Sequence, residues 1–109
     1  MKYVLLVYVD PSRKVPENNA ELTENWVNGM DSRGIRLIGS ELRPVEETTT
    51  VTVLNGKLAL SDGPFAETKE HIAGFDIIEC NNLDEAIAVA AQHPVALFGH
   101  IEVRSFWVR

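Results

Sequence analysis

The sequence predicts a single α+β domain over residues 1–109, and three observations favour it. The length of 109 residues is that of one domain. Strand-like and helix-like segments follow in the order strand, helix, strand, hairpin, strand, helix, strand. No internal repeat, low-complexity run or linker divides the chain.

The N-terminal part predicts a strand and a helix. Residues 3–9 are apolar at every position, which is typical of a strand that is covered on both faces. Residues 17–33 predict a helix, because Leu22, Trp26 and Met30 recur every four residues and form one apolar stripe. The glycine that follows Arg33 ends this helix.

The middle of the chain predicts a second strand and a hairpin. Residues 35–41 form the strand, and residues 48–54 alternate threonine with valine in the period of another. Asn55-Gly56 then precedes the apolar run 57–60. Because a type I′ turn needs positive φ at both central positions, Asn-Gly between two such runs predicts a two-residue hairpin turn.

The C-terminal half predicts a helical turn over residues 65–71, a strand over 74–79, a helix over 82–93 and a strand over 99–108. Asn82 followed three residues later by glutamate fits a capping box, and a proline follows the second helix. The apolar stripe expected on this helix consists of Leu83, Ala86, Ile87 and Ala90.

Without the hairpin, this order is βαββαβ, that of a ferredoxin-like sheet with both helices on one face. The first strand is apolar on the other face as well, and a second copy of the sheet would cover it. The sequence therefore predicts a ferredoxin-like fold with an inserted β-hairpin that forms a homodimer, a dimeric α+β barrel.

Composition excludes several function classes. Lys and Arg number 10 against 16 Asp and Glu, a net charge of −6, so no nucleic-acid partner is expected. No apolar run reaches the ~18 residues that span a bilayer, and the N-terminus lacks a signal-peptide pattern, so no membrane is expected. The single cysteine, Cys80, fits a cytoplasmic protein. No phosphate loop or dinucleotide fingerprint occurs, and no cofactor is expected.

The most specific motif is residues 62–70, which read Asp-Gly-Pro-Phe-Ala-Glu-Thr-Lys-Glu. Further matching motifs are Gly74-Phe75, Asp84-Glu85-Ala86, His93-Pro94 and Glu102-Val103-Arg104. Together these motifs resemble the DGPF family, within the YCII-related superfamily, over essentially the whole chain. The family pattern continues with a proline after the last motif, where this chain has Ser105.

The resemblance implies a ferredoxin-like α+β fold that dimerises, and it implies little about chemistry. Most relatives of this type carry no established activity, and some resemble proteins encoded beside sigma factors, which suggests a regulatory link. In the wider superfamily a His/Asp pair is proposed as catalytic, and lyase activity on halogenated aromatics is known. That histidine lies in the first helix region, whereas this chain has none before His71, so the mechanism is not carried over.

Charged residues around the signature are the candidates for a site. Asp62, held by a Gly-Pro turn, and His71, a residue type suited to proton exchange, are expected to act as acid and base. The residues expected to bind a small anionic or phenolic ligand are Lys69, Glu67, Arg43 and Arg104. Such a site would support a lyase- or isomerase-like proton transfer.

Other interpretations of the same residues stay open. The signature is also explained as a folding turn, and the chain as a non-catalytic module that binds a metabolite or a protein. Glu67, Glu70 and His71 would share one face of a helical turn; a solvated face explains them better than a metal site, so no metal is expected. His93, before a proline, is expected to cap the end of the second helix as an imidazolium.

Overall fold

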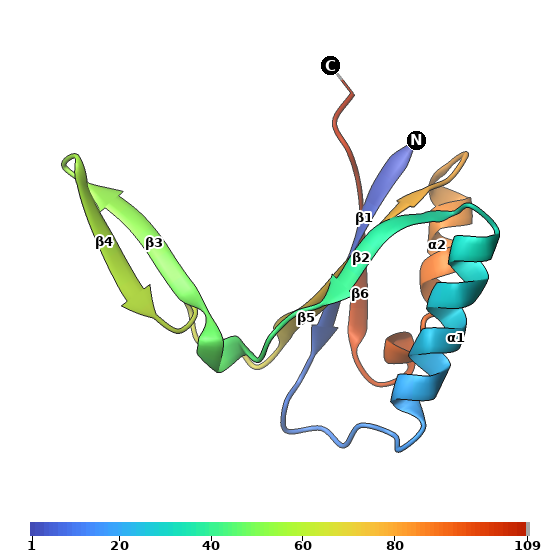
Figure 1. Ribbon diagram of the computed structural model, residues 1–109, viewed down its shortest axis with the longest axis horizontal. Helices are drawn as coiled ribbons and strands as arrows, with labels where there is room; N and C mark the ends of the chain where they lie inside the picture. Colours follow the sequence, from blue (N-terminus) through green and yellow to red (C-terminus); the bar gives the residue numbers. More distant parts are fainter. Residues whose placement is uncertain (109) are drawn as a thin grey trace.

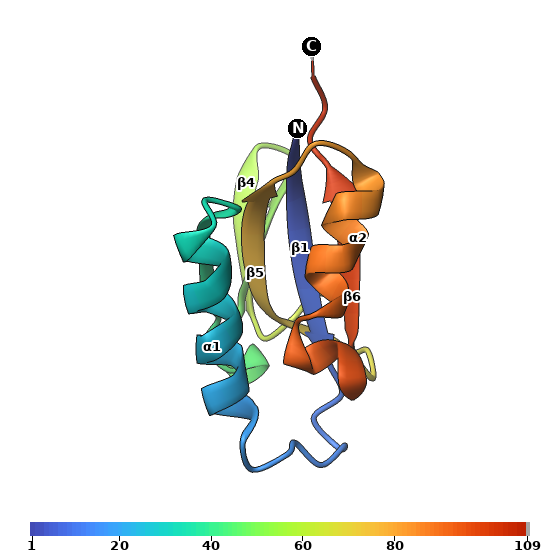
Figure 2. The ribbon, with the colours of Figure 1, turned by 90° about the vertical axis from the view of Figure 1, so that its right-hand side faces the viewer.

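The computed structural model describes residues 1–108, and at its centre lies a four-stranded antiparallel sheet. The strands are β1 (Lys2–Val9), β2 (Arg36–Glu41), β5 (His71–Glu79) and β6 (His100–Ser105). Their order, β2-β5-β1-β6, is that of a ferredoxin-like sheet. Two helices, α1 (Asn19–Ser32) and α2 (Leu83–Ala91), cover one face (Figures 1 and 2). The predicted α+β order with an inserted hairpin is confirmed.

Helix α1 is fixed to the core by its C-terminal half. Trp26 and Met30 are buried, and Trp26 Nε1 donates a hydrogen bond of 3.1 Å to the carbonyl oxygen of Val89 in α2. Leu22, the third residue of the predicted stripe, is 39% exposed, so the stripe is wrong at that position. A spacing of four residues turns by about 40° per step around a helix, which carries Leu22 away from the face that Met30 buries.

Helix α2 packs on the sheet through small side chains. Its buried residues are Ala86, Val89 and Ala90, and they allow the helix axis to approach the strands closely. The prediction is wrong for Leu83 and Ile87, which are 51% and 49% exposed at the edge of the buried face.

Local signals set both ends of α2. The Asn82 side chain accepts a hydrogen bond of 2.9 Å from the backbone N–H of Glu85, which confirms the predicted N-cap. After the helix, a 3₁₀ helix, η2 (Pro94–Leu97), leads into β6. Cys80, just before the cap, is buried as expected, and burial raises the pKa of its thiol.

Between β2 and β5 the chain forms a separate two-stranded sheet. Its elements are β3 (Thr49–Leu54) and β4 (Lys57–Asp62), preceded by a 3₁₀ helix, η1 (Val45–Glu47). Asn55 and Gly56 have φ angles of 51° and 77°, as the predicted type I′ turn requires. This hairpin, residues 49–62, projects from the side of the main sheet opposite the helices (Figure 1), and we call it the arm.

The signature segment after the arm is not helical, so the helical turn predicted over residues 65–71 is wrong. Gly63 has a φ of 90°, and the backbone then runs through bends until β5 begins at His71. Contacts with the body hold the segment instead: Lys69 lies 3.8 Å from Asp10, and Glu70 lies 2.6 Å from His100. Glu67, Glu70 and His71 therefore share no helical face.

The main sheet has an open face on the side away from the helices. Tyr3, Leu5 and Val7 of β1 are buried under the helices, so the alternate side chains of this strand point to the other face. Register gives the residues of this open face as Val4, Leu6, Tyr8, Phe75, Ile77, Glu102 and Arg104. The apolar centre of this face consists of Val4, Leu6, Phe75 and Ile77, and it is the surface that a second sheet was predicted to cover.

Candidate functional site

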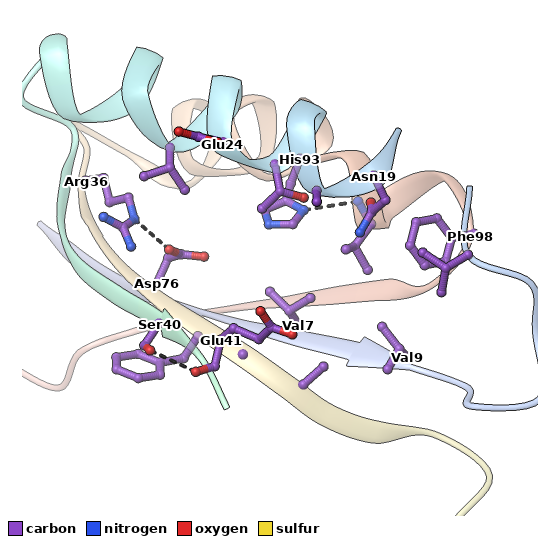
Figure 3. A pocket seen from close by; sticks show the side chains of 18 residues that line it. Val7, Val9, Asn19, Glu24, Arg36, Ser40, Glu41, Asp76, His93 and Phe98 are labelled. Atoms are coloured by element: carbon purple, nitrogen blue, oxygen red, sulfur yellow. Dashed lines mark hydrogen bonds and ion pairs between the residues drawn. The ribbon is translucent and has the colours of Figure 1, made fainter. Parts of the chain in front are cut away.

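A cavity of about 560 Å³ lies between α1 and the helix-covered face of the main sheet. Its walls come from α1, β1, β2, β5 and the turn after α2 (Figure 3). The ionisable side chains that line it are Glu24, Arg36, Glu41, Asp76 and His93. A volume of this size holds a small organic molecule.

The cavity exists because small residues meet at one end of the helix–sheet interface. The N-terminal half of α1 presents Ala20 and Thr23 to it, whereas the large buried side chains of this helix lie in its other half. Opposite them, β5 contributes Ala73 and Gly74. The space that larger side chains would fill is therefore left open.

The main charged feature of the cavity is the pair Asp76–Arg36. Asp76 is 6% exposed, and Arg36 Nε donates a hydrogen bond of 2.7 Å to Asp76 Oδ1. Burial raises the pKa of the Asp76 carboxyl, and the neighbouring Arg36 guanidinium opposes that rise without cancelling it. The second carboxylate oxygen points along the cavity (Figure 3), where it can exchange a proton with a ligand.

A glycine makes room for this pair. A Cβ atom at Gly39 of β2 would overlap Asp76 Oδ1, the backbone oxygen of Phe75 and Arg36 Nη2. Gly39 pairs with Asp76 across the β2–β5 ladder, so the missing side chain is what lets Arg36 reach the carboxylate along the strand.

His93 lies on another wall as a neutral imidazole. It is 4% exposed, and its ring centroid is 4.7 Å from that of Trp26. Burial lowers the pKa of His93 to about 4. Its Nδ1 accepts a hydrogen bond of 3.1 Å from Val95 N–H, so at neutral pH the ring proton is on Nε2. The expected imidazolium cap is thus wrong: His93 caps the start of η2 as a neutral ring that accepts from Val95 N–H.

Two polar atoms beside the cavity have no hydrogen-bond partner. Asn19 Oδ1 and Thr23 Oγ1 are both buried and unpaired, and both residues line the cavity one helical turn apart on α1. An unpaired buried acceptor costs free energy, so this wall favours a ligand that brings a hydroxyl donor.

The structure places the predicted acid–base and binding residues outside this cavity. Asp62 ends β4 and is exposed, and His71 begins β5, where it pairs with Val9. Glu67 and Lys69 are exposed in the signature segment, where Lys69 contacts Asp10. These residues are therefore close in sequence, between the end of β4 and the start of β5.

The two predicted arginines lie apart. Arg43 follows β2 at one edge of the main sheet and pairs with Glu47 at 3.0 Å. Arg104 is on β6, at the opposite edge, on the open face. Near it, a hydrogen bond to Glu102 raises the pKa of Tyr8. The arginines therefore do not form one anion clamp within a chain.

Asp76, Arg36 and His93 were not predicted as a group from the sequence. One signal was available: Asp76 interrupts the apolar strand between Phe75 and Ile77, at the same parity as the core residue Ile78. A charged residue on the core side of a strand needs a partner or a function.

No group of three or more His, Cys, Asp or Glu side chains in residues 1–108 is placed to hold a metal ion. Within the same range, no helix has the length and hydrophobicity that crossing a bilayer requires.

Known proteins resemble this chain in fold and sequence. A solved structure from Burkholderia phenoliruptrix AC1100, a 5-chloro-2-hydroxyhydroquinone dehydrochlorinase in complex with 2,5-dihydroxybenzoquinone, matches with a TM-score of 0.59 and 15% identity. The match covers 98% of this chain and 94% of the other. An uncharacterised protein of Rhizobium meliloti (strain 1021) is 33% identical over 105 residues, covering 83% of this chain and 77% of the relative. The YCII-related domain matches residues 1–108, and the chain therefore belongs to the YCII-related domain family.

Proposed function

We propose that this protein is a cofactor-independent enzyme that catalyses proton transfer on a small phenolic or anionic molecule, in a lyase- or isomerase-like reaction. The observation that carries the proposal is a buried carboxyl of raised pKa, Asp76, in a cavity of about 560 Å³. Burial moves the pKa of the carboxyl toward neutral pH. A group whose pKa lies near the working pH both accepts and donates protons most readily.

The remaining residues of the cavity have complementary roles in this proposal. Arg36 holds Asp76 Oδ1 in place and is itself held by Asp31 at 3.2 Å. His93 donates its Nε2 proton to a ligand oxygen that gains negative charge. A phenolic ligand is supported by one structural neighbour, a dehydrochlorinase whose structure was solved with a dihydroxybenzoquinone.

The test compares two aspartates on a panel of hydroquinones, catechols and small enolisable acids. Product formation is measured for the natural chain, Asp76→Asn and Asp62→Asn. Because Asp76 is the proton-transfer group, Asp76→Asn is expected to lower kcat at least 100-fold, and Asp62→Asn less than 3-fold. The reverse pattern would move the site to the signature segment, with Asp62 and His71 as acid and base and Lys69 and Glu67 beside them.

A non-catalytic function is the alternative, and the same panel separates it from catalysis. Saturable binding without product would make the chain a metabolite-binding module. Binding that Asp76→Asn weakens would still place the ligand in the cavity.

We further propose that residues 1–109 act as one domain, in the cytoplasm, as a homodimer with the open faces of two sheets packed together. The apolar centre of the open face, formed by Val4, Leu6, Phe75 and Ile77, supports the dimer. The buried thiol of Cys80 supports a reducing compartment.

A further inference from the structure

The arm presents an apolar face to solvent. Val51 pairs with Leu60 and Val53 pairs with Leu58 across the hairpin, so the four side chains share one face. Each of them is between 62% and 66% exposed. Thr50, Thr52, Ala59 and Ser61 form the other face. This alternation is that of a strand pair with one buried face, yet in a single chain nothing described covers it.

Within residues 1–108, the hydrogen bonds that hold the arm besides its own strand pairing lie at its base. Gly63 N–H donates to Thr48 O at 2.6 Å, and Thr50 Oγ1 donates to Gly63 O at 2.8 Å. An isolated two-stranded hairpin is marginally stable in water. The radius of gyration is 15.8 Å, against about 13 Å for a compact domain of this length. The arm therefore lacks the packing that its apolar face needs.

The position of the arm fits a second copy of the chain. Figures 1 and 2 show three layers in order, with the helices, the main sheet and the arm. The arm thus leaves the body on the side of the open face, where the proposed homodimer places the partner subunit. A two-fold pair gives each arm the partner's body to pack on and leaves no arm exposed.

The charge of the arm does not oppose contact with a second copy. Each chain carries a net charge of −6, which repels identical chains and anionic lipid surfaces alike. Within residues 49–62 only Lys57 and Asp62 are charged, and their charges are opposite. The arm is therefore a neutral apolar part of an acidic surface, where two copies can meet without repulsion.

The area of the arm is large enough for a stable contact. Its large exposed side chains are Val51, Val53, Leu54, Leu58, Leu60 and, just beyond it, Phe65. With roughly 100 Å² of apolar surface for each of Val51, Val53, Leu58 and Leu60, two arms and the surfaces that they cover would bury about 1,600 Å². Stable protein interfaces bury about 1,200–2,000 Å² in total.

We propose that the arm clasps a second copy of this chain through the face formed by Val51, Val53, Leu58 and Leu60. The inference rests on the proposed homodimer and extends it: the open faces form one contact, and each arm adds a second on the partner's flank.

Sedimentation velocity over a micromolar concentration series tests this. The arm variant is Val53→Thr with Leu58→Thr, which removes one apolar cross-strand pair and keeps residues that favour strands. The matched control is Thr52→Ser with Ala59→Ser, the neighbouring pair on the other face. The arm variant is expected to raise the dimer dissociation constant at least 100-fold, and the control to leave it within 3-fold.

A fluorescent label tests the contact with the apolar face intact. Lys57→Cys, at the tip of the arm, takes an environment-sensitive dye while the buried Cys80 stays unlabelled. The emission is expected to shift to the blue as the dimer forms, whereas a label at Lys14→Cys reports the loop after β1 as a reference. This readout does not depend on the arm variant folding.

The outcomes separate the two proposals. A dimer that the arm variant does not weaken, with no emission shift, overturns the clasp and leaves the open-face dimer standing. A natural chain that sediments as a monomer at micromolar concentration overturns both. An emission shift produced only by phosphatidylcholine vesicles would assign the arm to a membrane and overturn the clasp.

Discussion

Burial moves the pKa values of two residues in one cavity in opposite directions. It raises the pKa of Asp76, because the carboxylate loses hydration, and it lowers the pKa of His93, because the imidazolium does. Burial therefore shifts both groups toward the neutral form. A neutral donor beside a carboxyl that is able to exchange its proton is an arrangement suited to proton transfer near neutral pH.

The protonation of His93 predicts a loss of stability in acid. Its folded-state pKa of about 4 lies below the unfolded value of 6.5. The contribution of neutral His93 to the free energy of unfolding is thus complete above pH 6.5. It decreases by roughly 3 kcal/mol as the pH falls toward 4. Urea unfolding at pH 7 and pH 4 measures this difference. His93→Asn, which keeps an acceptor for Val95 N–H, is expected to reduce the difference in unfolding free energy between the two pH values by about that amount. His71→Asn is the control, and it is expected to show the same difference as the natural chain.

Replacement of threonine by valine is expected to change stability in opposite directions at two positions. Thr23→Val removes a buried hydroxyl that has no partner, so the free energy of unfolding is expected to rise by about 1 kcal/mol. Thr50→Val removes the hydrogen bond to Gly63 O and is expected to lower it by about 1 kcal/mol. Urea unfolding measures both, and a loss of stability in Thr23→Val would show that its hydroxyl is paired.

Across β2 and β5, one ladder position combines structure and proposed chemistry. Gly39→Ala forces a Cβ atom onto the Asp76–Arg36 pair and is expected to lower both kcat, by at least 10-fold, and stability, by more than 1 kcal/mol. Gly29→Ala is the matched control, because nothing lies within 4 Å of its Cβ position. The control is expected to gain up to about 1 kcal/mol from helix propensity. Equal effects at the two glycines would contradict the steric role of Gly39.

Elements with a strong local cause could be predicted from the sequence. The Asn-Gly turn and the Asn82 cap depend on backbone conformation and on hydrogen bonds within four residues. The helical turn predicted for the signature segment was wrong for the opposite reason. Its conformation depends on the distant partners Asp10 and His100, which no local pattern reveals.

At the scale of the whole molecule, the topology was more accessible than the site. The order of the elements limits a βαββαβ chain to few sheets, whereas the cavity joins Arg36, Asp76 and His93 from three separate segments. The cavity also depends on small side chains that leave space unfilled. Hydrophobic periodicity shows which residues face the core, but it does not show where the core contains a cavity. The charged signature was the more visible motif, and it lies outside the cavity.

The uneven anchoring of α1 bears on how the proposed ligand would enter the cavity. Trp26 and Met30 hold the C-terminal half of the helix, so the half beside the cavity can tilt outward with little loss of buried apolar contact. The opposite wall is a hydrogen-bonded ladder that cannot widen unless it breaks. A ligand wider than the cavity would therefore displace the N-terminal half of α1 rather than the sheet, and the loop of residues 10–18 that leads into the helix would move with it.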